Sequence, residues 1–436
     1  MMSEDNHDEV HMTTPELITK HGYIAETHHV WTEDGYRLEL HRVLRKTQAR
    51  NSKKSCTEPC DDKIPELSKT DSNESSILSG ALALQAKDES NVKIKPPILV
   101  NHGLLSSSAD WVLLGPQKAL AYVLCDCGFD VWLANVRGNT YSQCHKQYTT
   151  RDREFWDFSW HEIGYYDLPA MIDYILDKTH QTSLHYIGYS QGTTTFYVMC
   201  SERPEYNDKI KGMVSMAPVA FLTNQRSPLI KFIVRFYILM EWGSVYCNIH
   251  QWFPRNRLQA KALGTLIRNT PGALTKSFYS CWFYLIAGFG SNQLDKSMLP
   301  LIFGHFPGGS SAKQIIHFSQ IILSDSFRKF DYGTSKNLKL YGSTQPPKYC
   351  LERVKVPVAV FYSENDFLTD PADVQRLIEK FPNVVLKHKI EYSKFNHIDY
   401  LWGRDARTLL YTHIIDFIKK IQMSESSSMT NFTHVQ

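Results

Sequence analysis

The chain has 436 residues, 42% of them hydrophobic, so it is long enough to fold around a large core. Its formal net charge of +3 is small for this length and no block of Lys or Arg stands out, which argues against a nucleic-acid-binding surface. The sequence contains no apolar run of the roughly 18 residues that a transmembrane helix needs, and its acidic, polar start does not resemble a signal peptide.

The first predicted elements are the two strands of a hairpin. Residues 26–34 and 36–43 lie on either side of Gly35 and have the composition of paired strands. From Leu44 to about Lys93 the sequence becomes charged, rich in Ser and poor in aromatic residues, which predicts a flexible insertion at 44–93. We interpret it as a tolerated surface loop in preference to a regulatory or partner-binding segment.

Short apolar strands then alternate with helical patterns. In chain order we expect a strand at Pro97–Asn101, a helix around Pro116–Cys127, a strand at Phe129–Ala134, a helix that begins near Asp167 and Pro169, a strand at 184–188, a helix ended by Pro204, and a strand at 210–220. Each strand is apolar throughout. This pattern predicts an α/β fold, with a mostly parallel central sheet and helices on both of its faces.

Residues 221–347 interrupt the alternation and predict an inserted, largely helical cap. They include "SPLIKFIVRFYILMEW", in which Lys231 and Arg235 lie one turn apart among apolar residues. The alternation returns with the strand "VPVAVFY", the helix "PADVQRLIEKF", the strand "VVLKHKIEY" and a last helix from about Asp405 to Lys420. We therefore expect a core at 14–220 and 348–421, with polar tails at 1–13 and 422–436.

The pattern G-x-S-x-G at residues 188–192 points to a nucleophilic serine. Ser190 follows an apolar strand and precedes a helix, and Gly188 and Gly192 are the small residues that a tight turn between them requires. The alternative is a glycine bend whose serine only caps the next helix. The strand and the helix on either side favour a nucleophile elbow.

An activated serine also needs a base and a group that orients that base. The acid should lie in the loop after a later strand, where Asp366, Asp370 and Asp373 are available. Asp370 precedes Pro371 and suits a helix N-cap, and Asp373 suits the first turn of the same helix. We therefore favour Asp366, with Asp370 as the second choice.

The base must follow the acid in this fold. Downstream of Asp366 the candidates are His388, His397 and His413. His388 lies inside a predicted strand and His413 inside the last helix, whereas His397 lies in the loop between them. Because such sheets carry their chemistry on loops at strand ends, we predict His397 as the base.

The oxyanion formed during acyl transfer needs two backbone donors. One is expected to be the N–H of Gln191, which follows the nucleophile, and the other should come from the loop after the first parallel strand. The sequence "NHGLLSSS" fits that loop, with the N–H of Leu104 as our choice. We expect His102 to shape this loop in preference to acting in catalysis.

These residues and their flanks resemble the acid lipases, the family of gastric and lysosomal acid lipase. The resemblance covers about residues 14–421 except for the insertion. The motifs that carry it are "TTPELITKHGYIAETHHVWTEDGYRLELHRV", "VNHGLLSSSADWV", "GFDVWLANVRGNTYSQCHK", "EFWDFSWHEIGYYDLPAMIDYIL", "LHYIGYSQGTT", "GSTQPPKY", "ENDFLTDPADV" and "FNHIDYLWG".

The resemblance implies an α/β-hydrolase core with a helical cap and lid. It implies hydrolysis of triacylglycerols or sterol esters at a lipid–water interface, with transient contact to a membrane or lipid droplet, and the triad Ser190, Asp366 and His397. It places the lid near Leu222–Trp242, although an ordinary packed cap helix explains that pattern equally well. It also implies secretion or lysosomal delivery, whereas no signal peptide is visible. In the cap, Ala287 stands where the family leads us to expect a second cysteine near Cys281.

The sequence thus predicts a lipase that acts through an acyl-enzyme on Ser190. Two alternatives remain: a serine hydrolase acting on another acyl substrate, such as a soluble ester or thioester, and a non-enzymatic lipid-binding relative. The complete set of expected catalytic parts argues against the latter. No metal-ligand pattern is present, so we expect neither a metal nor another cofactor.

Overall fold

The computed structural model describes residues 9–46, 95–246, 250–253, 262, 265–266, 280–281 and 283–432. Most of the predicted insertion at 44–93 and part of the predicted cap therefore lie outside the described residues. The described residues up to Arg45 and from Pro96 onward form one compact unit. Leu44, which the sequence pattern assigned to the insertion, instead ends a strand of the sheet, where it pairs with Ile24.

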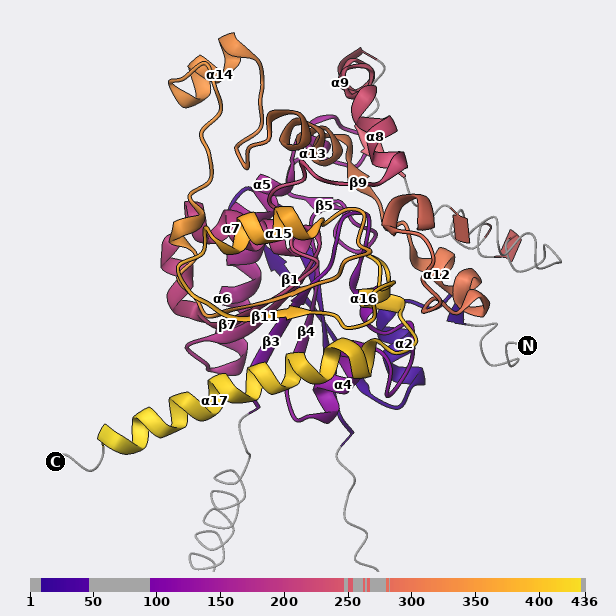
Figure 1. Cartoon of the computed structure of the whole chain (residues 1–436), viewed down its shortest axis with the longest axis vertical. Coiled ribbons are helices and arrows are strands. Elements are labelled where there is room, and N and C mark those ends of the chain that lie inside the picture. The colour runs from indigo at the N-terminus through magenta and orange to yellow at the C-terminus, as the bar shows by residue number, and fades with distance from the viewer. Residues whose placement is uncertain are drawn as a thin grey trace, which may run out of the picture. The chain divides into compact units, whose positions relative to one another are not determined.

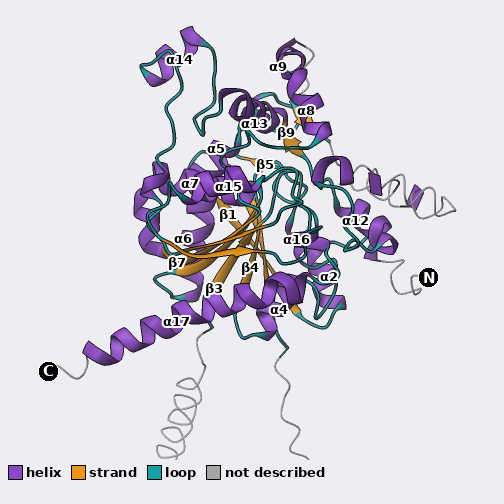
Figure 2. Cartoon of the chain, in the orientation of Figure 1, coloured by secondary structure: helices purple, strands orange, loops and turns teal. Residues whose placement is uncertain are grey.

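A nine-stranded sheet lies at the centre of the described residues (Figures 1 and 2). Its strands are β1 Ile24–Trp31, β2 Tyr36–Leu44, β3 Pro97–Asn101, β4 Asp130–Asn135, β5 Cys144–His145, β6 Leu184–Tyr189, β7 Ile210–Met216, β10 Val358–Tyr362 and β11 Val384–Lys389. They are ordered β1-β2-β4-β3-β6-β7-β10-β11, with β5 paired to β2. The pairs from β4 to β11 are parallel, and β1, β2 and β5 add an antiparallel edge. The predicted hairpin and parallel sheet are confirmed.

Helices cover both faces of the sheet. The covering helices are α2 Thr14–Lys20, α4 Leu120–Asp126 and α17 Thr412–Phe432 on one face, and α6 Leu168–Thr179, α7 Gln191–Glu202 and α15 Pro371–Ile378 on the other. Alternate residues of a strand point to opposite faces, so Leu133 of β4 joins the first core cluster and Trp132 the second. This double burial explains why β3, β4 and β6 are buried along their whole length and are mostly apolar.

The helix before β6 begins earlier than predicted. Ser159 caps α5 (Trp160–Glu162) in a capping box with Glu162, and a π turn at Ile163–Asp167 leads on into α6. Asp167 does not cap this helix. Its carboxylate accepts the backbone N–H of buried Arg137 at 2.9 Å and the Nε–H at 2.7 Å. Because Asp suits both a cap and a buried ion pair, the local pattern did not separate the two roles.

The described part of region 221–347 is mostly helical. Its helices are α8 Pro228–Arg235, α9 Tyr237–Tyr246, α12 Leu299–His305, α13 Ala312–Ser324 and α14 Thr334–Tyr341. A small antiparallel pair, β8 Gln251–Trp252 with β9 Ser310–Ser311, was not predicted. At the other end of the chain, α17 continues to Phe432, beyond the expected core boundary at 421. No helix in the described ranges is long and apolar enough to cross a membrane.

Candidate active site

Ser190 lies at a sharp turn between β6 and α7. Its φ of 52° is unusual for a residue with a side chain and is typical of the strained turn that presents a nucleophilic serine. A Cβ on Gly188 would lie 2.8 Å from the Gly192 carbonyl oxygen, and one on Gly192 would lie 2.6 Å from that of Asn101. Only glycine therefore fits at the two flanking positions of this turn.

The structure brings Ser190, His397 and Asp366 into one hydrogen-bonded chain. His397 Nε2 lies 2.9 Å from Ser190 Oγ, and His397 Nδ1 lies 2.7 Å from Asp366 Oδ2. Because the carboxylate accepts the Nδ1 proton, Nε2 is left as an acceptor for the serine hydroxyl. Asp366 is fully buried and His397 nearly so, whereas Ser190 is partly exposed. The geometry therefore suits proton transfer from an accessible serine to a sheltered imidazole.

The three candidate aspartates have different partners. Asp366 is held by Thr369, whose backbone N–H bonds to Oδ1 at 3.0 Å and whose hydroxyl bonds to Oδ2 at 2.6 Å. Asp370 caps α15, as expected. Asp373 accepts the backbone N–H and the side-chain amide of Asn224, which ties α15 to the start of region 221–347. Asp366 is thus the one of the three that binds the imidazole.

The three candidate histidines are also distinguished by their contacts. His388 lies in β11 and His413 lies near the start of α17. Their rings face each other, with centroids 4.2 Å apart. Of these three, His397 is the one that is hydrogen-bonded to the elbow serine.

The loop after β3 approaches the elbow closely. A Cβ on Gly103 would lie 3.3 Å from Ser190 Cβ, so Leu104 follows directly beside the nucleophile. Gln191 is the first residue of α7, so its backbone N–H has no intrahelical acceptor and lies at the positive end of the helix dipole. The N–H groups of Leu104 and Gln191, which we predicted from the sequence to form the oxyanion hole, therefore belong to segments next to Ser190.

His102 shapes this loop through both of its ring nitrogens. Its Nδ1 donates to the Gly103 carbonyl oxygen at 2.8 Å, and its Nε2 accepts the backbone N–H of Val136 at 3.3 Å. Burial lowers the pKa of His102 to about 4, so the ring is neutral at physiological pH. A neutral imidazole with both nitrogens bonded suits a structural role beside the oxyanion loop.

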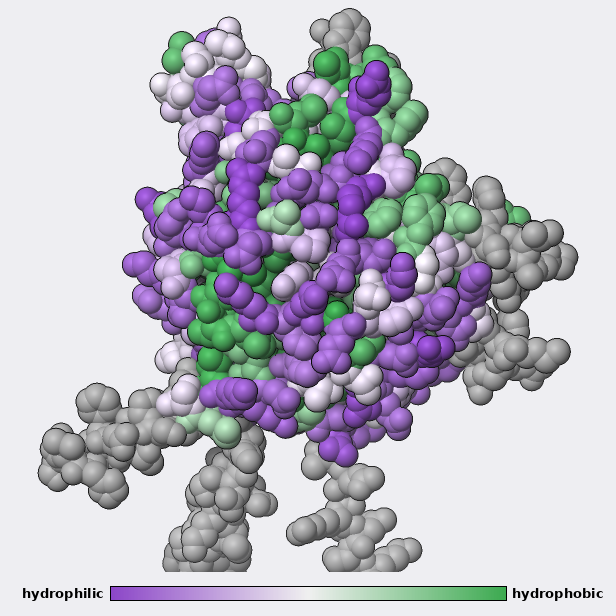
Figure 3. All heavy atoms as spheres, viewed as in Figure 1, coloured by the Kyte–Doolittle hydropathy of each residue, from purple (hydrophilic) through white to green (hydrophobic). Residues whose placement is uncertain are grey.

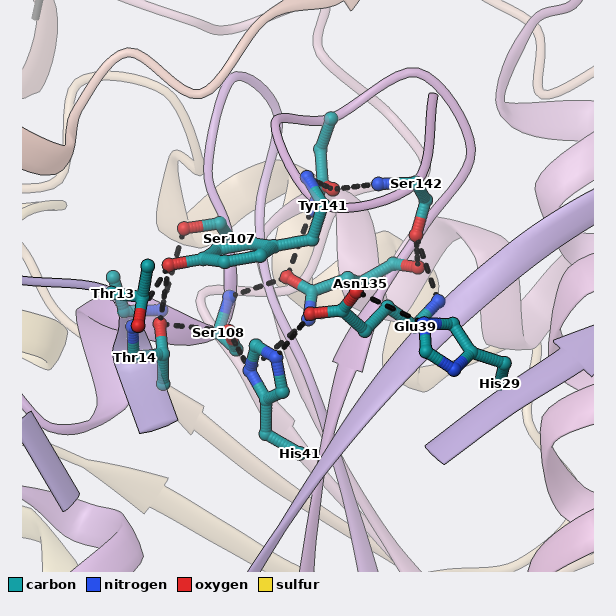
Figure 4. A network of polar contacts seen from close by, with 12 residues as sticks. Thr13, Thr14, His29, Glu39, His41, Ser107, Ser108, Asn135, Tyr141 and Ser142 are labelled. Atoms are coloured by element: carbon teal, nitrogen blue, oxygen red, sulfur yellow. Dashed lines mark hydrogen bonds and ion pairs between the residues drawn. The ribbon is translucent and has the colours of Figure 1, made fainter. Parts of the chain in front are cut away.

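A buried polar network holds the chain that follows this loop (Figure 4). Asn135, at the end of β4, accepts the Ser108 N–H at 3.0 Å. His41 of β2 lies between Ser108 Oγ, at 2.8 Å, and Glu39 Oε1, at 2.7 Å. Ser108 and His41 are fully buried, so this second group of serine, histidine and carboxylate is closed to substrate and anchors the loop instead.

Two residues near the triad were not singled out from the sequence. Tyr189 donates its hydroxyl to the His397 carbonyl oxygen at 2.8 Å. Asp399 is fully buried, and its Oδ2 accepts the Ser291 hydroxyl at 2.6 Å and the Asn396 N–H at 2.8 Å. Tyr189 directly precedes Ser190 in "GYSQG", and Asp399 follows His397 by two residues in "FNHID", which was the available signal. Ser291 lies about a hundred positions away, and nothing local marked it.

Asp399 predicts a pH dependence of stability. Burial, followed by the charge of Asp366, raises the pKa of Asp399 to about 7. An aspartate in an unfolded chain has a pKa of about 3.9, so ionisation of Asp399 disfavours the folded state. The stability that the protonated Asp399 contributes is complete below about pH 4 and is lost as the pH rises through about 7. The unfolding free energy of the wild type should therefore fall by on the order of 2 kcal/mol between about pH 5 and pH 8, and Asp399→Asn should not show this fall.

Urea unfolding of the wild type and of Asp399→Asn at both pH values checks this expectation. The groups whose electrostatics couple to Asp399 are the Asp366 carboxylate and the hydroxyls of Tyr189, Tyr284 and Tyr400, all common to both proteins. Burial raises the pKa of each of these three tyrosines above its usual value near 10, so none of them ionises between about pH 5 and pH 8. Equal changes with pH in the two proteins would contradict the prediction.

Comparison with known proteins places these features in a family. Residues 96–238 match the family model "alpha/beta hydrolase fold", and residues 14–115 match "Partial alpha/beta-hydrolase lipase region". Lipase 1 of Drosophila melanogaster is 37% identical over 411 residues, which cover 94% of this chain and 80% of that protein. Human gastric triacylglycerol lipase is 32% identical, over 94% of this chain and 92% of its own. A crystal structure from Sulfolobus solfataricus shares the fold, with a TM-score of 0.52 at 14% identity over 88% of this chain and 90% of that chain.

The parallel sheet and the serine elbow at the end of β6 define an α/β-hydrolase. With relatives of 32–38% identity along most of its length, the chain belongs to the acid lipase family, that of the gastric and lysosomal-type lipases. It is therefore a carboxylic ester hydrolase, and the fold, family and enzyme class expected from the sequence are confirmed. Within the described ranges, no cluster of three or more His, Cys, Asp or Glu side chains is arranged to hold a metal ion.

Proposed function

We propose that the protein hydrolyses carboxylic esters of neutral lipids, namely triacylglycerols, cholesteryl esters or both, through Ser190. The observation that carries the proposal is the hydrogen-bonded chain from Ser190 through His397 to Asp366 at a glycine-flanked elbow. The names of relatives support the substrate class. Beside the gastric triacylglycerol lipases, a Crotalus adamanteus relative, 33% identical over 95% of this chain and 92% of its own, is provisionally named a lysosomal acid lipase/cholesteryl ester hydrolase.

In the proposed mechanism, His397 Nε2 takes the hydroxyl proton as Ser190 Oγ attacks the ester carbonyl carbon. The N–H groups of Leu104 and Gln191 stabilise the negative oxygen of the tetrahedral intermediate. The intermediate collapses, the alcohol leaves with the proton from His397, and an acyl group remains on Ser190. Water then attacks this acyl group with the same base, which releases the fatty acid and restores the serine. Asp366 keeps the imidazole oriented and stabilises its positive charge.

We also propose the division of the chain into a core at 14–220 and 348–421 and a cap at 221–347, with a lid near Leu222–Trp242. The exposed apolar side chains of α8 and α9 support the assignment of a lid to this segment. Phe232 is 62% exposed, Ile238 57% and Leu239 65%, and Figure 3 shows hydrophobic residues around these helices at the top of the view. Such a face, with exposed cations between apolar residues, suits transient contact with a membrane or lipid-droplet surface.

Hydrolysis of three substrates tests the function. Emulsified triolein, a cholesteryl ester and the soluble ester 4-nitrophenyl butyrate are compared across pH, with Ser190→Ala as the control. We expect the wild type to hydrolyse at least one emulsified ester, with an activity that rises when the substrate forms an interface. Ser190→Ala should lack this activity. A wild-type enzyme that hydrolyses only the soluble ester, indifferent to the interface, would favour the alternative of another acyl substrate.

The double variant Phe232→Ser/Leu239→Ser tests the lipid-contacting face. Burial of a large apolar side chain contributes about 1.5–3 kcal/mol, so we expect at least about a 10-fold loss of activity on emulsified triolein with little change on the soluble ester. Val385→Ser on β11 is the matched control, because Val385 is also exposed (52%) but lies on the core sheet. Parallel losses on both substrates would show that the two residues act in the fold and not at the interface.

A further inference from the structure

A short cap segment, residues 287–293, lies against both loops that carry the proposed acid and base, and is here called the strap. The Ala287 carbonyl oxygen accepts the N–H of Phe367 at 3.1 Å and the N–H of His397 at 3.3 Å. Phe367 directly follows Asp366 in the chain. One acceptor in the cap thus bonds to the backbone beside the acid and to the backbone of the base itself.

The next two residues of the strap extend these contacts. The Gly288 carbonyl oxygen accepts the side-chain amide of Asn396 at 2.9 Å, and that of Phe289 accepts the amide of Asn365 at 2.9 Å. The Asn365 amide also donates to the Lys394 carbonyl oxygen at 2.8 Å. Asp366 and His397 therefore each have a neighbour in the chain that is hydrogen-bonded to the strap.

The backbone at Gly288 shows how closely the strap and the acid loop pack. Gly288 has a φ of 125°, a conformation that favours glycine. A Cβ at this position would clash with the Asn365 carbonyl oxygen. The two backbones therefore lie in direct contact, so a shift of the strap displaces the acid loop as well.

Ser291 and Asp399 fasten the strap to the loop of the base. Ser291 Oγ donates to Asp399 Oδ2 at 2.6 Å, and the Asn396 N–H donates to the same oxygen at 2.8 Å. Asp399 begins the short helix α16 (Asp399–Trp402), two residues after His397. Ser291 and Asp399 are both buried, so water competes little for these bonds.

We propose that the strap is a positioning element of the active site, which sets the separation of the Asp366 and His397 loops and is locked by the Ser291–Asp399 hydrogen bond. This inference rests on the proposed function, because it assigns roles around the proposed triad. Catalytic groups must be held within about 0.5 Å of their productive positions, and a displacement of about 1 Å costs on the order of 100-fold in rate. The strap residues act through the backbone of two loops and not on the reacting atoms.

Ser291→Ala and Asp399→Ala test the strap, with hydrolysis of 4-nitrophenyl butyrate as the assay. We expect kcat to fall about 10- to 100-fold in both variants while KM changes by less than about twofold, because the base is displaced and the ester-binding surface is not. Asn292→Ala is the matched control: Asn292 lies in the same segment but is exposed, and its variant should keep wild-type kcat. Asp399→Asn retains an acceptor oxygen and should keep more activity than Asp399→Ala; equal losses would contradict the role of the hydrogen bond.

Titration with a fluorophosphonate separates positioning from stability. A purely structural role would lower the melting temperature and the number of titratable sites but leave kcat per titrated site unchanged. Wild-type kcat per site in both Ser291→Ala and Asp399→Ala would overturn the proposal. A wild-type enzyme that hydrolyses no ester would instead overturn the proposed function, so the two failures are distinguishable.

Discussion

Ser190→Ala is expected to lower kcat about 10⁴- to 10⁶-fold on every ester that the enzyme accepts, because no other group can carry the acyl intermediate. The fold should survive. The only side-chain hydrogen bond of Ser190 among the described residues is the one to His397 Nε2, and its side chain does not cap α7. Alanine keeps the Cβ and tolerates the φ of 52° no worse than serine. We expect the unfolding free energy to change by less than about 1 kcal/mol.

Activity and labelling by a fluorophosphonate are measured together for this variant. Loss of both, with an unchanged circular dichroism spectrum and melting temperature, is the expected outcome. Ser343→Ala, at an exposed serine in the loop after α14, is the control and should behave as wild type. Full turnover by Ser190→Ala would exclude Ser190 as the nucleophile. Failure of the wild type to be labelled would revive the non-enzymatic lipid-binding alternative.

Asp366→Asn is expected to lower kcat by about 10⁴-fold, because it reverses the hydrogen bond to the imidazole. Asp366 Oδ1 accepts two backbone N–H groups, those of Leu368 and Thr369, so the oxygen of an asparagine must occupy that side. Its amide then points at His397 Nδ1 and donates to it. The imidazole must carry its proton on Nε2, where it cannot accept the proton of Ser190.

Asp370→Asn is the matched control for this prediction. Asp370 is the second candidate acid and caps α15 by accepting the Ala372 N–H at 3.0 Å. Asparagine is an equally good N-cap, and the partly exposed ion pair with Arg226 contributes little, so we expect kcat within about twofold of wild type. Steady-state kinetics on the soluble ester distinguish the two variants. A large loss in Asp370→Asn with a small one in Asp366→Asn would reverse the assignment.

The sequence by itself determined the parts of this protein that depend on local pattern. Uninterrupted apolar strands that alternate with helices can only be buried on both faces of a parallel sheet. Two glycines around Ser190, between a strand and a helix, favour a tight turn that presents the serine over a bend whose serine only caps the helix. The chain order of acid and base then reduced the candidates to three aspartates and three histidines. Asp370 ranked second to Asp366 because its position before Pro371 already marked it as a helix cap.

The tertiary structure decided what depends on contacts between distant segments. Whether Asp167 capped a helix or bound Arg137 was settled by where β4 lies, and whether Asp366 faced His397 was settled by the packing of two loops. The strap was invisible in the sequence. Its Ala287 acts through a carbonyl group that every residue has, and Ser291 meets Asp399 across 108 positions. Helical and strand periodicities encode which face of an element is buried, but they carry no information on which cap segment packs against the acid and base, because that choice is made only when the whole chain is compact.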